Sequence, residues 1–176
     1  MTWILMNLNL ILKMPDKIVI NTGPIISIVA ATGSLNILNK LYKDVYVPYE
    51  VNREISGSFI KTFALKEFNE ATFLRKAKTP VDISTILKNI LDIGEASVIQ
   101  LALNKNIQTV CIDEKVGRRV ARLNNLSLIG STSILIKAKN LGYLKSMKNA
   151  ISEMKNKGIY LSDNIINFAL KHTNEI

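Results

Sequence analysis

Short apolar runs alternate along the chain with longer segments in which apolar residues recur every three or four positions. This alternation is typical of strands that alternate with helices. The apolar runs predict strands at residues 18–20, 45–47, 72–74, 108–112 and 126–129. Strands separated by helices form parallel sheets that are covered on both faces. The pattern therefore predicts an α/β fold, a three-layer α/β/α sandwich with a central, mainly parallel sheet.

Helical spacing of apolar residues fills the intervals between these strands. The expected helices cover residues 25–31, 35–42, 51–55, 58–70, 82–91, 95–104, 116–123, 132–140, 144–155 and 163–170. Gly94 is expected to interrupt the pattern just before Glu95, and Ser162 and Asp163 are expected to cap the last helix. No repeat or linker divides this series. We therefore expect one domain over residues 15–176, preceded by an extension, residues 1–14, to which the sequence assigns no role.

The chain starts with an apolar stretch, residues 1–12, that does not indicate a membrane protein. A membrane-spanning helix needs roughly 20 apolar residues, and this stretch is shorter. It also lacks the basic segment that opens a signal peptide. The sequence therefore favours a cytoplasmic protein that does not associate with membranes.

The composition narrows the available chemistry. Cys111 is the only cysteine and lies in an apolar run, while His172 is the only histidine and lies near the end of the chain. These facts argue against a disulfide framework, a Ser-His-Asp or Cys-His catalytic site and a histidine-based zinc site. Carboxylates, hydroxyls, lysines and arginines remain, and carboxylate oxygens are ligands for Mg²⁺ or Mn²⁺.

A set of acidic or acid-like residues lies where strands end and helices begin. Its members are Asn21, Glu54, Asp92, Glu95 and Asp113. Ligands bind at the carboxyl ends of strands in open parallel sheets, so carboxylates gathered there would bind Mg²⁺ or Mn²⁺ and could support phosphodiester hydrolysis. Each residue also has a simpler interpretation: a first-turn acid, a helix cap, a partner for a surface lysine or, for Asn21, a turn residue.

The positive charge of the chain suggests a phosphate-rich partner. The net charge is +9 at pH 7 and the isoelectric point is about 9.7. Basic residues on the helix after Asp113 are candidates for nucleic-acid binding: Lys115, Arg118, Arg119 and Arg122. They could hold phosphates and make binding salt-dependent. The alternative is a solvated helix face with no specific partner.

Several short motifs, in a fixed order, resemble the PIN-domain family, and in particular its short prokaryotic members related to VapC-type toxins. The resemblance runs from Ile18 to the end of the chain. The motifs are Ile-Val-Ile-Asn-Thr-Gly-Pro-Ile-Ile (18–26), Val-Pro-Tyr-Glu-Val-Asn-Arg-Glu-Ile (47–55), Asp-Ile-Gly-Glu-Ala (92–96), Cys-Ile-Asp-Glu-Lys-Val-Gly-Arg-Arg-Val-Ala (111–121), Ile-Gly-Ser-Thr (129–132), Lys-Ala-Lys-Asn-Leu-Gly-Tyr-Leu (137–144) and Gly-Ile-Tyr-Leu-Ser-Asp (158–163).

The resemblance implies a ribonuclease that depends on Mg²⁺ or Mn²⁺, forms homodimers and often has a small antitoxin protein as partner. Carried over by motif, the four acidic positions of the family fall on Asn21, Glu54, Glu95 and Asp113, with Asp92 and Glu114 as substitutes. Asn21 departs from the pattern, because the family has an aspartate there. A neutral amide in place of a carboxylate should weaken metal binding.

Two main hypotheses follow. The first is a metal-dependent endoribonuclease, the toxin of a toxin–antitoxin pair being one form. In it Glu54, Glu95 and Asp113 hold the metal. Asp92 is a further candidate ligand, and Asn21 is a weak ligand or orients the water. The second is a catalytically degenerate relative that binds nucleic acid or a protein partner, because Asn21 replaces the first acid. A nucleotide-binding or receiver-like domain is a third class, but the chain has no glycine-rich phosphate loop.

Overall fold

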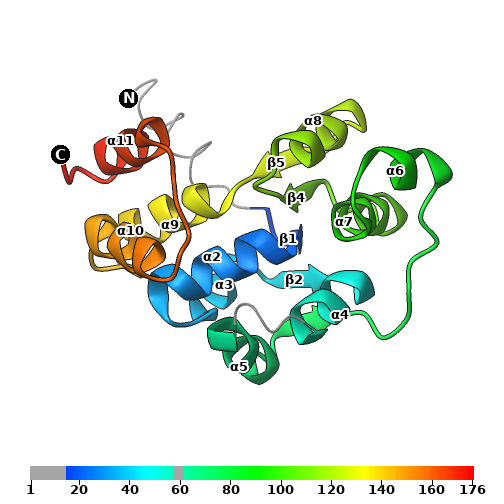
Figure 1. The fold of residues 1–176 in the computed structure, drawn as a ribbon, viewed down its shortest axis with the longest axis horizontal. Helices are drawn as coiled ribbons and strands as arrows, with labels where there is room; N and C mark the ends of the chain where they lie inside the picture. Colours follow the sequence, from blue (N-terminus) through cyan, green and yellow to red (C-terminus); the bar gives the residue numbers. More distant parts are fainter. Residues whose placement is uncertain (1–14, 58–61) are drawn as a thin grey trace, which may run out of the picture.

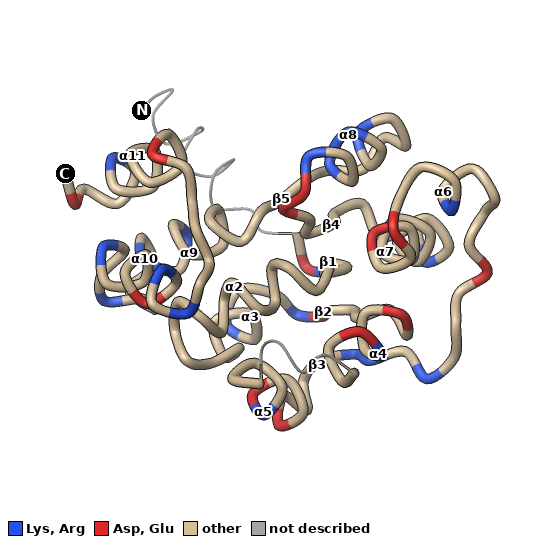
Figure 2. The backbone as a smooth tube through the Cα atoms, viewed as in Figure 1, with Lys and Arg blue, Asp and Glu red and all other residues tan. Residues whose placement is uncertain are grey.

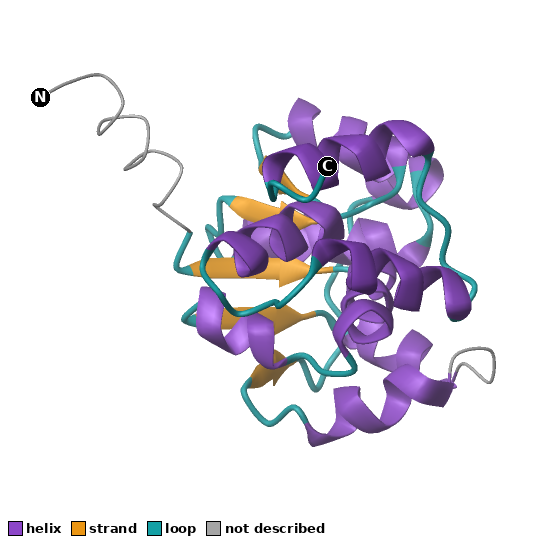
Figure 3. Cartoon of the chain, turned by 90° about the vertical axis from the view of Figure 1, so that its left-hand side faces the viewer, coloured by secondary structure: helices purple, strands orange, loops and turns teal. Residues whose placement is uncertain are grey.

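Five parallel strands form the sheet of the computed structural model, which describes residues 15–57 and 62–176. The extension expected at residues 1–14 lies outside the described residues. The strands are β1 (Lys17–Ile20), β2 (Asp44–Val47), β3 (Leu74–Lys76), β4 (Thr109–Cys111) and β5 (Ser127–Ile129). They lie in the order β3-β2-β1-β4-β5, and Figure 3 shows them side by side and pointing in one direction. The expected parallel α/β fold is confirmed.

The strand order reverses beside β1. The chain moves outward from β1 through β2 to β3, then returns to the other side of β1 to form β4 and β5. Ile18 pairs with Val45 of β2, while Ile20 pairs with Cys111 of β4. In open α/β sheets, such a reversal leaves a crevice at the carboxyl ends of the two strands, where ligands bind. The fold therefore points to the ends of β1 and β4.

Helices cover both faces of this sheet. They are α2 (Thr22–Thr32), α3 (Asn36–Leu41), α4 (Tyr49–Gly57), α5 (Thr62–Glu70), α6 (Thr85–Ile90), α7 (Ile93–Asn104), α8 (Lys115–Leu123), α9 (Ser131–Asn140), α10 (Met147–Asn156) and α11 (Asp163–His172). Figure 1 shows α2 with α9 and α10 on one side of the strands and α7 on the other. In the part of the chain that the structure describes, no helix is long and apolar enough to cross a membrane.

The central strand explains the apolar runs seen in the sequence. Ile18, Val19 and Ile20 are all fully buried, because helices pack against both faces of β1. A strand with one wet face would alternate apolar and polar residues instead. The helix α7 is also buried from Gly94 to Ile99, so both elements beside the strand-order reversal are held rigidly in the core.

Most helix and strand boundaries differ by one to three residues from the sequence-based expectation, and two of the differences have a clear local cause. The third strand begins at Leu74 rather than residue 72, since Thr72 and Phe73 form a turn. Gly94 does not interrupt a helix but lies in the first turn of α7, because Asp92 caps this helix by accepting a hydrogen bond of 2.8 Å from the Glu95 amide. Of the helix expected over residues 58–70, the structure describes the part that forms α5, and residues 58–61 lie outside it.

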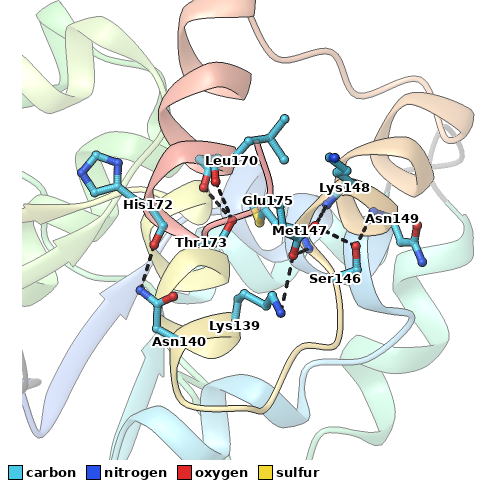
Figure 4. Close-up of polar contacts among 11 residues, drawn as sticks. Lys139, Asn140, Ser146, Met147, Lys148, Asn149, Leu170, His172, Thr173 and Glu175 are labelled. Carbon is cyan, nitrogen blue, oxygen red and sulfur yellow. Dashed lines mark hydrogen bonds and ion pairs between the residues drawn. The ribbon is translucent and has the colours of Figure 1, made fainter.

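The end of the chain is held by a carboxylate that caps a neighbouring helix (Figure 4). Glu175 accepts hydrogen bonds from the amides of Met147 and Lys148, at 2.7 and 2.9 Å, and from the Ser146 hydroxyl at 2.9 Å. The Lys139 amine lies 3.6 Å away. Burial raises the pKa of Glu175, but these donors outweigh it and lower the pKa to about 2. A negative charge at the N-terminus of α10 also complements the helix dipole.

The Glu175→Gln variant should be less stable than the parent at pH 7 and equally stable near pH 2. The folded pKa lies below the unfolded value of 4.5, so the contribution of this carboxylate is present above pH 4.5 and is lost as the pH falls toward 2. Allowing for solvent screening, we expect a loss of about 1 kcal/mol at pH 7. Urea unfolding at both pH values measures it, with Glu153→Gln on exposed α10 surface as control. Equal losses at both pH values would contradict the argument.

Candidate active site

The crevice at the ends of β1 and β4 begins with Asn21. Its backbone amide donates a hydrogen bond of 3.0 Å to the backbone carbonyl of Cys111. This bond continues the pairing of β1 with β4. Asn21 is only 5% exposed. Helix α2 starts at the next residue, Thr22, so the Asn21 side chain is fixed at the junction of a central strand and a helix.

Three oxygen atoms from three elements surround Gly94. A Cβ atom at this position would lie 3.1 Å from Glu54 Oε2, 3.3 Å from Asp92 Oδ1 and 3.4 Å from Asn21 Oδ1. The missing side chain of Gly94 therefore leaves a small space that a helical residue would normally fill. The Thr22 hydroxyl orients one of the three groups, since it donates a hydrogen bond of 2.6 Å to Glu54 Oε2.

Glu95 lies buried beside this space. The residue is only 4% exposed, and its carboxylate lies against Gly117 of α8, where no larger residue would fit. Burial is the main reason that its pKa is raised to about 7, and the negative charges of Asp92 and Glu114 raise it further. The nearby amide of Gly117 acts in the opposite direction but too weakly to offset them.

Two buried oxygen atoms of the site lack a hydrogen-bond donor. They are Asn21 Oδ1 and Glu95 Oε1. A buried acceptor without a partner costs roughly 1–3 kcal/mol, so such atoms normally meet an ordered water or an ion. Their presence at the end of the central strands indicates a place that favours a bound cation or water.

Of the two acids after β4, Glu114 lies closer to this site. Its Oε1 would contact a Cβ atom on Gly23 at 2.8 Å, and its charge acts on Glu95. The Asp113 side chain instead accepts a hydrogen bond of 2.8 Å from the amide of Ser131, at the start of α9. The structure thus places Asn21, Glu54, Asp92 and Glu95 close together. The carboxylate that faces them from the end of β4 belongs to Glu114, not to Asp113. The use of Asp113 as a ligand stays a prediction.

The basic residues expected to contact nucleic acid divide into two groups. Arg118 is half-buried and donates hydrogen bonds to the carbonyls of Ile112 and Ile129, at 2.8 and 3.5 Å. It therefore ties the ends of β4 and β5 together. The exposed members of the set are Lys115, Arg119 and Arg122. Figure 2 shows the positive charges of α8 close to the acidic residues after β4.

The donor set fits a hydrated divalent cation better than a closed metal cage. Within residues 15–57 and 62–176, no three His, Cys, Asp or Glu side chains converge closely enough to hold one ion. Mg²⁺, however, usually keeps several waters and takes only one or two carboxylates. Asn21 and Glu95 supply buried oxygens, while Glu54, Asp92 and Glu114 are exposed carboxylates at the rim. These residues suit a cation that stays partly hydrated.

A parallel α/β sheet with acidic residues at its strand-order reversal is the arrangement that the motif resemblance to PIN domains predicts. A family model described as DUF3368, PIN domain, matches residues 17–175. The chain therefore belongs to this PIN-domain family, whose members are typically nucleases that use divalent metals. No curated protein and no solved structure matched the chain.

Two features of the site were not evident from the sequence. The sequence predicts only an interruption at Gly94 and assigns no role to Gly117, yet the missing side chains of both leave the room that Asn21, Glu54 and Glu95 occupy. The signal was present, because a glycine inside a helical pattern that is otherwise apolar often has a packing or functional reason. Each of these glycines lies close in sequence to one of the acids.

Proposed function

We propose that this protein is a divalent-metal-dependent endoribonuclease of the PIN type. The observation that carries the proposal is the gathering of oxygens around Gly94, together with two buried oxygens, Asn21 Oδ1 and Glu95 Oε1, that lack donors. Oxygen atoms so placed favour a hard cation. Such a cation can activate the attacking water and offset the charge on the phosphate during phosphodiester hydrolysis.

Each residue of the site has a proposed part. A bound Mg²⁺ or Mn²⁺ would supply an activated water and relieve the charge on the phosphate. Asn21 and Glu95 would hold it from the buried floor, and the exposed acids Asp92 and Glu54 would bind its waters from the rim. Thr22 keeps Glu54 in position through its hydroxyl.

RNA is the proposed substrate, and the exposed cations of α8 support it. Lys115, Arg119 and Arg122 lie on the helix that follows Glu114, so they could hold phosphates next to the acidic site. A role as the toxin of a toxin–antitoxin pair is a finer proposal that rests on the motif resemblance. A homodimer is supported by the exposed isoleucines of one edge, Ile86 and Ile90 of α6, since apolar residues gathered on a surface mark association sites.

The test is cleavage of a mixed RNA pool by purified protein in Mn²⁺ or in EDTA. We expect cleavage in Mn²⁺ only, and at least a tenfold loss in Glu54→Gln, because one charge at the rim is removed. Glu70→Gln, an exposed acid at the end of α5, is the matched control. Asp113→Ala and Glu114→Ala assayed in parallel identify which of the two acids contributes. Cleavage that survives EDTA, or a Glu54→Gln variant as active as the control, would overturn the proposal.

A second candidate is a catalytically degenerate PIN domain that binds nucleic acid or a protein partner. Asn21 is the observation that favours it, since the position contributes no charge to the site. In that case RNA binding persists in EDTA, and it weakens when Arg119 and Arg122 are both replaced by glutamine. Metal-stimulated cleavage by the unmodified protein would exclude this candidate.

A further inference from the structure

A second, basic pocket lies away from the acidic site, under the connection between β3 and α6. It has a volume of about 850 Å³ and is lined by residues of β2, β3, the following loop and the end of α7. None of the acidic-site residues lines it. Glu95 lies in the first turn of α7 and Lys105 follows its last turn, so the two sites are separated by roughly 15 Å along this helix.

The wall of the pocket is fixed rather than loose. The loop that forms it, residues 77–84, is held at three points. Its first residue, Ala77, donates a backbone hydrogen bond of 2.9 Å to the Val47 carbonyl of β2. Further along, the Val81 amide donates one of 3.2 Å to Glu50 of α4, and the Ser84 amide donates one of 3.1 Å to Gln100 of α7. Figure 2 shows this long connection running from β3 past α4 to α6. A pocket anchored to two helices can present side chains in a constant arrangement.

Cations are grouped around one aromatic ring in this pocket. The Lys105 amine lies 5.5 Å from the centre of the Tyr46 ring, and the Arg75 guanidinium lies 5.9 Å from it. Asp44 holds the guanidinium through a contact of 2.5 Å. The cation–π contact positions the Lys105 charge without neutralising it, whereas the Asp44 carboxylate offsets the charge of Arg75 and fixes its guanidinium.

Basic residues outnumber acidic ones in the lining, and Lys78 and Lys105 form no ion pair with an acidic residue in the part of the chain that the structure describes. The basic residues of the pocket are Arg75, Lys76, Lys78 and Lys105, and the acidic one is Asp82. Lys76 is directed elsewhere, because its amine donates to the carbonyls of Phe68 and Asn69. Arg75, Lys78 and Lys105 remain exposed, and the Arg75 side chain is 59% accessible. An anion is therefore the ligand that this lining favours.

We propose that this pocket binds a nucleotide unit, with its phosphate on Lys78 and Lys105 and its base on the open face of Arg75. A guanidinium plane and a half-buried aromatic floor suit the stacking of a base, and ammonium groups suit phosphate. The unit is either part of a single-stranded RNA or a free mononucleotide. In the first case the pocket is an additional RNA-binding site, remote from the acidic residues.

The test measures binding in EDTA, so that it does not depend on cleavage. A fluorescein-labelled 12-nucleotide single-stranded RNA is titrated with the protein and with the double variant Lys78→Gln/Lys105→Gln, followed by anisotropy at several salt concentrations. The matched control is Lys155→Gln/Lys171→Gln, which removes two exposed charges from α10 and α11.

The pocket variant should bind about tenfold more weakly at 50 mM salt. The slope of log K against log salt should fall by about 0.7, because the two lysines hold one phosphate and each phosphate contact to a single strand contributes about 0.7. The control should lose much less. Adenosine monophosphate and inorganic phosphate serve as competitors. If adenosine monophosphate competes as strongly as unlabelled RNA, the pocket binds free nucleotides. If it competes more weakly, the pocket binds RNA. Both outcomes agree with the proposal.

Equal affinities and slopes for the pocket variant and the control would overturn the proposal, as would the absence of any RNA or nucleotide binding by the unmodified protein. The outcome is separate from that of the proposed ribonuclease. If the protein binds RNA through this pocket but cleaves no RNA, the proposed ribonuclease activity is contradicted and the proposed binding role of the pocket is still supported.

Discussion

Replacing Glu95 with glutamine should lower metal-dependent RNA cleavage by at least about 100-fold while making the metal-free protein more stable above pH 7. Glu95 is the buried carboxylate of the site, and its Oε1 atom has no hydrogen-bond donor. Losing its charge removes the strongest attraction for a cation from the floor of the site. Removing a single oxyanion-hole donor typically costs about 10²–10³ in rate, and we expect a loss of similar size when a ligand of the cation loses its charge.

The stability half of this prediction follows from the raised pKa. The pKa of Glu95 is about 7 in the folded protein, against 4.5 without burial and its acidic neighbours. Below pH 4.5 the carboxyl is protonated in both states and destabilises nothing. As the pH rises toward 7, the unfolded chain releases its proton first, so stability falls by up to about 3 kcal/mol.

Glutamine removes this dependence, because it resembles the protonated carboxyl at every pH. Urea unfolding in EDTA at pH 5 and pH 8 should give a stability gain for Glu95→Gln that is larger at pH 8. The Glu70→Gln control should show no such difference between the two pH values. A Glu95→Gln variant that cleaves RNA normally would show that this carboxylate is not a metal ligand. A stability gain that does not grow with pH would show that the carboxylate is not buried in its charged form.

The second large effect is expected from Asn21→Asp, which should bind Mn²⁺ at least about tenfold more tightly than the parent. The added carboxylate would stand next to Glu54 and Asp92 around Gly94. One further negative charge within the site stabilises a divalent cation by more than 1.4 kcal/mol, which corresponds to a factor of ten. Cleavage at low Mn²⁺ should rise in proportion.

The same substitution should lower the stability of the metal-free protein against unfolding. Position 21 is 5% exposed, so a new carboxylate would be buried among like charges, and this raises the free energy of the folded state. Calorimetric titration with Mn²⁺ and thermal unfolding in EDTA measure the two effects. Unchanged Mn²⁺ affinity would mean that the Asn21 side chain does not face the ion. Cleavage by Asn21→Asp alone would favour the degenerate-domain hypothesis for the natural chain.

Much of the fold could be predicted from the sequence because the pattern is local. A central strand covered on both faces, such as Ile18–Ile20, must be apolar throughout, and each amphipathic helix must repeat its apolar positions. The start of α7 was missed because a glycine two residues after a cap reads as an interruption, whereas the Asp92 side chain holds the helix turn that contains it.

The sequence could predict that several acidic residues lie close together, but not how they are arranged. Strand ends and helix starts put Asn21, Glu54 and Glu95 in one crevice. The neighbours Asp113 and Glu114 cannot be told apart by position, since a one-residue difference decides which side chain faces the crevice. Ser131 decides which of the two faces the crevice, because its backbone amide donates a hydrogen bond to the Asp113 carboxylate. The basic pocket was not predictable, since it depends on the path of a loop.

The burial of the only cysteine makes this chain convenient for spectroscopic probes. Cys111 lies in the fully covered strand β4, and burial raises the pKa of its thiol well above the ordinary value. Since the thiolate is the reactive form, maleimide dyes should leave the natural chain unlabelled. One cysteine introduced at Thr79, on the exposed wall of the basic pocket, would then carry a single dye, whose emission could report the arrival of a nucleotide without any change to Cys111.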